Sequence, residues 1–80
     1  MVKSLRPYQI ASIGCGILAN ECNARASRAG NLDDMKAEID RGADWAAKGM
    51  GLLDGSVAYM PILDRDLQTA YDAAIKRIKG

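Results

Sequence analysis

The sequence has no histidine and no phenylalanine, one tryptophan and two cysteines in 80 residues. Without histidine, the chain lacks the commonest general base and a frequent metal ligand. Cys15 and Cys22 lie seven residues apart, about 10 Å along a helix, whereas a disulfide requires roughly 4.4–6.8 Å between Cα atoms. No third cysteine completes a zinc site. We therefore predict no catalytic residue, no metal site and no cofactor.

The charge balance and the longest apolar run argue against nucleic acid and membrane partners. The chain carries 11 basic and 10 acidic side chains, whereas nucleic-acid binding normally needs a concentrated positive field. The apolar run at 10–19 is about half the length of a membrane span. The first nine residues do not resemble a signal peptide. With two unpaired cysteines, these features predict a cytoplasmic protein.

Large side chains for a hydrophobic core are scarce. Thirteen residues are alanine, which buries little area at a gain of roughly 25 cal/mol per Å². Chains this short usually add a disulfide, a metal or a partner subunit to their core. Since the first two are not expected, we predict a single domain over residues 1–80 that forms a homo-oligomer.

The periodicity of apolar residues predicts an all-α fold, a small bundle of two long antiparallel helices plus a C-terminal helix. The expected helices cover residues 5–29, 32–53 and 65–79. Ser4, Asn31 and Asp64 are their predicted N-caps. The conformation of 54–63 stays open between a helical turn and an extended link, because the residue before Pro61 avoids the α region.

Two of these helices carry a clear apolar stripe. In the third helix the stripe consists of Leu67, Ala70, Tyr71, Ala74, Ile75 and Ile78. The apolar stripe of the second helix consists of Leu32, Met35, Ile39, Ala43 or Gly42, Ala46, Met50 and Leu53. Its spacings of three and four are typical of a coiled-coil seam, and the opposite side of that helix is predicted to face solvent.

The first helix has a strip that is polar, small and uncharged where a surface helix would carry Lys and Glu. This pattern predicts that a second subunit covers the helix. The expected interface residues are Ser12, Gly16, Asn20 and Asn23. Glycine would allow close approach, and the two asparagines could pair across a symmetric interface. The alternative is a monomeric bundle with the first helix at its centre.

A candidate binding patch surrounds Trp45, which lies away from the apolar stripe of its helix. Arg41 and Lys48 are four residues before it and three after it, on the same side. This group could stack and pair an anionic ligand or anchor a protein contact. Alternatively, the third helix or the N-terminal arm covers Trp45, and the two cations snorkel beside it or form a salt-bridged contact with Asp64, Asp66 or a neighbouring subunit. Arg6 and Tyr8 form a second, smaller candidate patch.

The segment 35–50, MKAEIDRGADWAAKGM, resembles a helix of the small phage proteins that sequester cyclic oligonucleotide signals, the anti-CBASS sponge family. The likeness rests on the step Trp45-Ala46 and its surroundings, about 16 of 80 residues. Family members are short all-α chains that form hexamers. The resemblance implies a phage origin and a counter-defence role in the host cytoplasm. This chain departs from the pattern in the further helix after Asp64, and no binding residue carries over.

Three hypotheses for the function follow. The first is a non-enzymatic oligomeric binding protein that inhibits a host protein by direct contact. The second is a sponge for an anionic cyclic nucleotide, bound in pockets between subunits. The third is a small helical DNA-binding regulator, which the balanced charge and the lack of a basic recognition helix disfavour.

Overall fold

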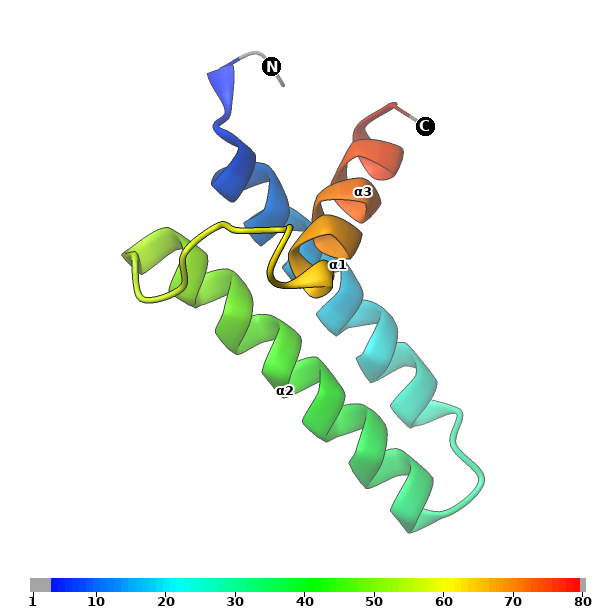
Figure 1. Ribbon diagram of the computed structural model, residues 1–80. Helices are drawn as coiled ribbons and strands as arrows, with labels where there is room; N and C mark the ends of the chain where they lie inside the picture. The colour runs from blue at the N-terminus through cyan, green and yellow to red at the C-terminus, as the bar shows by residue number, and fades with distance from the viewer. Residues whose placement is uncertain (1–3, 80) are drawn as a thin grey trace.

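A computed structural model describes residues 4–79, and these residues form three helices and no strand. The helices are α1 (Pro7–Ser27), α2 (Leu32–Asp54) and α3 (Arg65–Lys79). Helices α1 and α2 run antiparallel as a long hairpin, and α3 lies across the first half of α1 (Figure 1). The predicted all-α bundle of two long helices and a C-terminal helix is confirmed.

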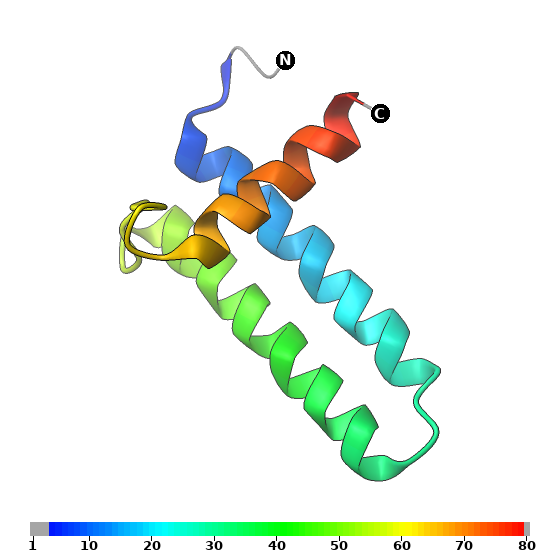
Figure 2. The ribbon, with the colours of Figure 1, turned by 45° about the vertical axis from the view of Figure 1, so that its right-hand side comes forward.

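The hairpin extends well beyond α3. Figure 2 shows that the second half of α1 and the first half of α2 continue past the third helix as a two-helix arm. The described chain is accordingly elongated, with extents of 42 × 29 × 20 Å. In this arm, the apolar side chains of α1 and α2 can be buried only against each other.

The start of α1 differs from the prediction. The helix begins at Pro7, and Arg6 rather than Ser4 occupies the N-cap position. Arg6 is extended, with φ −82° and ψ 156°, because the residue before a proline is sterically kept out of the α region. Proline itself is favoured in the first turn, where its missing N–H needs no partner. At the other end α1 stops at Ser27, two residues earlier than predicted.

The starts of α2 and α3 agree with the prediction. Asn31 caps α2, since its side-chain oxygen accepts a hydrogen bond of 2.8 Å from the backbone N–H of Asp34. Asp64 caps α3 by accepting one of 3.0 Å from the backbone N–H of Asp66. Each cap satisfies a backbone donor that the first turn of a helix leaves free.

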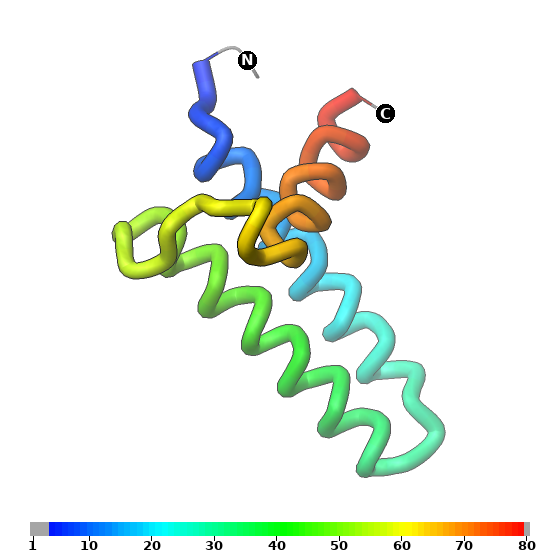
Figure 3. The backbone as a smooth tube through the Cα atoms, in the orientation of Figure 1, coloured from blue at the N-terminus to red at the C-terminus, as the bar shows by residue number. Residues whose placement is uncertain are grey.

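The connection between α2 and α3 folds back along the end of α2 (Figure 3). It begins at Gly55, whose φ of +87° is the left-handed conformation that ends many helices. Residues 58–60 have no regular secondary structure, and 61–63 form a turn. The segment 54–63, left open by the sequence, therefore consists of the last residue of α2, a bend, a short irregular stretch and a turn at 61–63.

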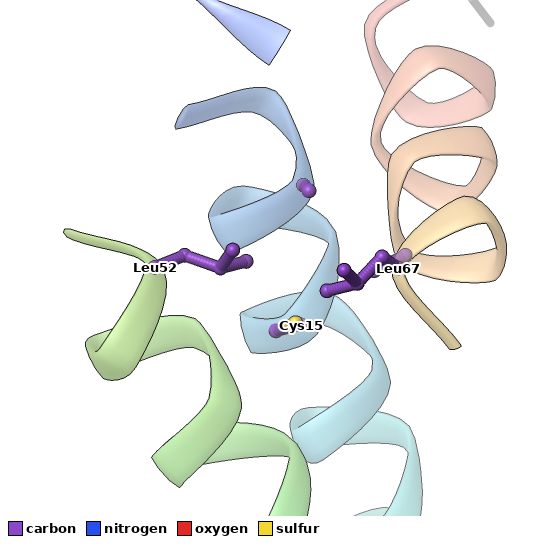
Figure 4. Packing of buried hydrophobic residues seen from close by; sticks show 5 residues of the cluster. Cys15, Leu52 and Leu67 are labelled. Carbon is purple, nitrogen blue, oxygen red and sulfur yellow. The ribbon is translucent and has the colours of Figure 1, made fainter. Parts of the chain in front are cut away.

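The centre of the core lies where all three helices meet. Cys15 of α1 sits between Leu52 of α2 and Leu67 of α3 (Figure 4). Ala11 and Ala70 complete this buried cluster. The fully buried side chains with the largest volume are Leu67, Cys15 and Cys22, so the packing relies on close approach of backbones rather than on bulky residues.

Glycines make the helix contacts close. A Cβ placed on Gly14 would lie 1.6 Å from the backbone oxygen of Ala70, so α3 rests directly on the backbone of α1. A Cβ on Gly42 would meet Cys22 at 3.2 Å, and one on Gly49 would meet Cys15 at 3.0 Å. These glycines allow the helices to pack closer than ordinary side chains permit.

The apolar stripe of α2 does not face α1. Instead α2 turns Gly42, Gly49 and Leu52 toward its neighbour, with Trp45 packed against the core cluster. Four of the seven stripe residues are large hydrophobics that remain exposed: Leu32, Ile39, Met50 and Leu53. The prediction that this stripe is the packing seam is therefore wrong within the protomer, where glycine, which hydropathy patterns overlook, defines the side of α2 that packs.

Candidate binding surfaces

The predicted patch around Trp45 forms a real surface depression. Arg41, Trp45 and Lys48 line one pocket of about 650 Å³, together with Asp44, Ala47, Val57 and Asp66. Its volume lies within the range of small-molecule sites, about 300–1,000 Å³. The structure therefore brings together the three α2 residues that the sequence grouped, beside the start of α3.

The two cations of this pocket already have anionic partners. Lys48 Nζ lies 2.6 Å from Asp64 Oδ2 and 3.5 Å from Asp66 Oδ2. Arg41 Nη1 lies 3.1 Å from Glu38 Oε1. The hydrogen bond from Lys48 lowers the pKa of Asp64 and raises the pKa of Lys48. Lys48 thus ties the start of α3 to α2, the structural role that the sequence left as an alternative.

Arg6 and Tyr8 belong to a different part of the surface. Neither residue lines the Trp45 pocket. Tyr8 is half-buried and packs against the core cluster, next to the end of α2 and the connection that follows. The backbone N–H of Arg6 donates to Gln9 Oε1 at 2.8 Å, which fixes the start of α1. The structure assigns both residues contacts within the protomer.

The predicted interface residues of α1 divide into two groups. Ser12 is turned toward α2, where its hydroxyl donates a 2.8 Å hydrogen bond to the backbone oxygen of Gly49. Gly16, Asn20 and Asn23 are exposed, and a Cβ on Gly16 would have no atom within 4 Å. Three of the four residues therefore remain accessible to a second subunit.

The hairpin has two distinct sides. On one side Gly14 touches α3, and two residues later Gly16 is exposed. On α2, Lys48 reaches Asp64 at the start of α3, whereas Ala46 and Met50 are exposed. A step of two residues rotates the position around a helix by about 200°. Gly16, Ala46 and Met50 therefore lie on the side away from α3.

We call this side the open face. It consists of Gly16, Asn20 and Asn23 of α1 and the apolar stripe of α2. At the position of the stripe where the sequence offered Ala43 or Gly42, Ala43 is the exposed residue. The only charged residues within α1 are Glu21 and Arg25, and both lie on the α3 side. Glu21 lines a groove with Lys76 and Arg77 of α3, and Arg25 Nε pairs with Glu38 Oε2 at 3.2 Å.

A third surface was not singled out from the sequence. Met60, Ile62 and Leu63 project from the connection before α3, and Ile62 is 95% exposed and Leu63 76% exposed. The available signal was the run Met60-Pro61-Ile62-Leu63, which is unusually apolar for a link between helices. We call these residues the apolar turn, 60–63.

The chemistry of the cysteines is restricted by burial. Cys15 and Cys22 are free and buried, and burial raises the pKa of the Cys15 thiol. A buried thiol with a raised pKa is a poor nucleophile. Among residues 4–79, no group of three metal-ligating side chains comes together, and no helix in this range is long and apolar enough to cross a membrane.

Comparison of the chain with protein-family models, curated proteins and solved structures gave no match. The resemblance of the segment 35–50 to the sponge family therefore stays a prediction, and the function has to be argued from the surfaces described above.

Proposed function

We propose that this protein is a non-enzymatic, homo-oligomeric binding protein that inhibits another protein by direct contact. The observation that carries the proposal is the apolar turn, 60–63, where the side chains of Ile62 and Leu63 are almost fully exposed to solvent. Apolar groups exposed together on a small protein are a frequent mark of a protein-binding site.

The apolar turn is held in a fixed shape. The backbone N–H groups of Leu63 and Asp64 both donate to the backbone oxygen of Met60 at 3.0 Å. Asp64 is in turn bound to Lys48 of α2. A contact surface that is ordered before binding loses less conformational entropy when a partner arrives, which favours a recognition role for Ile62 and Leu63.

The partner is a protein with an apolar pocket wide enough for an isoleucine side chain. If the resemblance to phage sponge proteins reflects origin, that partner is a host defence protein in the host cytoplasm. In this proposal the small protein acts by occupying a surface of its target, and it has no catalytic residue, metal or cofactor.

The test compares Ile62→Asp with Ala37→Asp, which changes an exposed alanine on α2. Exposed substitutions usually change stability by no more than about 0.5 kcal/mol, so both variants should fold. The tagged wild-type protein is used to capture partners from host extract, and each candidate is purified and titrated by calorimetry. Ile62→Asp should weaken binding at least about tenfold, since burying an isoleucine contributes about 1.5–3 kcal/mol. Equal affinity of the two variants would refute the role of the turn.

The Trp45 pocket supports a second candidate, a sponge for an anionic cyclic nucleotide. Its specific support is the grouping of an indole ring with Arg41 and Lys48 around one cavity. Since both cations are paired within the protomer, a ligand would have to compete with carboxylates. Cyclic di- and trinucleotides should raise the melting temperature if this candidate is correct, because a ligand stabilises the folded state that binds it. The double variant Arg41→Glu, Lys48→Glu should abolish that rise.

A further inference from the structure

We infer that a second copy of this chain covers the open face, with the two α2 helices antiparallel and related by a two-fold axis that passes between Gly42 and Ala43. The two hairpins then form a four-helix bundle, and each α3 lies on the outside. This inference rests on the homo-oligomer of the proposed function, but it does not depend on the apolar turn or on its partner.

The first argument is the exposure of the apolar stripe. Leu32 is 75% exposed, Met50 69% and Leu53 61%. Their heptad-like spacing makes these residues a continuous row along α2 rather than scattered surface groups. A row of this kind is the seam of a helix that packs against another helix, and α1 does not occupy it.

The second argument is the symmetry of the stripe. An interface across a two-fold axis must be self-complementary, because residue i meets residue j and j meets i. In an antiparallel α2 pair centred between Gly42 and Ala43, every stripe residue meets another small or apolar residue at the same height. The pairs are Leu32 with Leu53, Met35 with Met50, and Ile39 with Ala46, and the two copies of Ala43 meet beside the axis. Ile39 thus meets the small Ala46 near the axis, whereas large side chains meet each other toward the two ends of the stripe.

The third argument comes from α1 and is independent of that spacing. Gly42 lies level with Ala19 and Asn23, since a Cβ on Gly42 would be within 3.3 Å of both residues. Between these two residues in α1 lies Asn20, which is exposed on the open face. The axis chosen from α2 therefore passes close to Asn20. A carboxamide has both a donor and an acceptor, so Asn20 can pair with its own symmetry mate.

The area and the charge of the face also fit a second copy. Helices of 21 and 23 residues are about 32 and 35 Å long, and two adjacent helices are about 20 Å wide. The footprint is about 650 Å² per protomer, about 1,300 Å² in total, which lies in the lower range of specific interfaces. No residue of the open face is charged, so two copies can meet without burying an unpaired charge.

The mass in solution tests the assembly. Sedimentation equilibrium at micromolar concentration should give twice the 8.6 kDa of the chain. Ala46→Arg places a charge in the centre of the stripe and should halve the mass. Ala37→Arg is the matched control, an exposed alanine of α2 on the side away from the stripe, and should leave the dimer intact. A monomeric wild-type protein, or a dimer that survives Ala46→Arg, would overturn the inference.

Cysteine cross-linking tests the register, with the wild-type protein and its two buried thiols as the background. Ala43→Cys should form a disulfide-linked dimer on mild oxidation, because residues 43 of the two copies lie beside the axis. Leu32→Cys alone should not, since its two copies would be about 30 Å apart at 1.5 Å per residue. Leu32→Cys mixed with Leu53→Cys should give a cross-linked heterodimer. Cross-linking of Leu32→Cys with itself would indicate a parallel pair and overturn the register.

The same variants separate this inference from the proposed function. Ile62→Asp should lose the partner and keep the dimer mass, whereas Ala46→Arg should lose the dimer and keep each protomer's contact with the partner. If Ile62→Asp keeps its partner, the dimer inference is unaffected, and if Ala46→Arg keeps the dimer mass, the role of the apolar turn is unaffected.

Discussion

Two glycines in α1, only two residues apart, should respond to alanine with opposite signs. A Cβ on Gly14 would lie 1.6 Å from the backbone oxygen of Ala70, whereas one on Gly16 would meet nothing within 4 Å. Ordinary contact begins near 3.4 Å, so Gly14→Ala must move α3 away from α1 by nearly 2 Å. No rotamer change can relieve this, because the obstacle is backbone.

The size of the effect follows from what α3 contributes. Moving α3 loosens the packing of Leu67, whose burial contributes about 1.5–3 kcal/mol, and overpacking itself costs about 1–3 kcal/mol. After the gain in helix propensity of about 1 kcal/mol, we expect Gly14→Ala to destabilise the fold by about 3 kcal/mol. Gly16→Ala keeps only the propensity term and should stabilise the protomer by about 1 kcal/mol.

The assay is urea unfolding followed by circular dichroism, performed on the Ala46→Arg background so that assembly does not contribute to the measured stability. At about 4–8 °C per kcal/mol for a domain of this size, Gly14→Ala should also lower the melting temperature by roughly 15 °C. Equal effects of the two alanines would refute the close contact between α1 and α3.

Three further results are expected. Stability from the Lys48–Asp64 pair should be complete above about pH 4 and lost as the pH falls through the lowered pKa of Asp64. Lys48→Met should remove this part of the pH dependence of unfolding, and an unchanged acid limb would contradict the pair. Asn20→Asp should weaken the dimer by about 3 kcal/mol, roughly a hundredfold, since two charges about 6 Å apart at an effective dielectric constant of 20 repel by that amount. Sedimentation would measure the loss, and a dimer of wild-type affinity would place Asn20 away from the axis. The buried thiols of Cys15 and Cys22 should react with a thiol reagent only on unfolding, and rapid labelling of the native protein would contradict their burial.

The sequence predicted the helices well because their signals are local. The caps at Asn31 and Asp64 are single side chains that bond to the next turn, and apolar periodicity defined α2 and α3 almost to their ends. The predicted start of α1 is wrong because Pro7 keeps Arg6 out of the α region, a restriction that apolar periodicity does not contain.

The packing of the helices was harder to predict. Gly42 and Gly49 form the side of α2 that meets α1, yet hydropathy gives glycine almost no weight, so apolar periodicity predicts the stripe as the main packing seam. The grouping of Arg41, Trp45 and Lys48 in one pocket followed from helical spacing. The pairing of Lys48 with Asp64 and Asp66 could not be predicted in the same way. It depends on the path of the connection before α3, and no local sequence pattern determines that path.

The position of the apolar turn on the α3 side has a consequence for valency. In a dimer joined through its open faces, the two copies of Ile62 lie on opposite outer surfaces. A single dimer would then hold two target molecules, or two subunits of one oligomeric target. In the second case the first contact raises the effective concentration for the second, and overall affinity can exceed that of one turn by 10²–10⁴. A weak contact through one exposed turn would in this way be enough for a protein of 80 residues to block a much larger one.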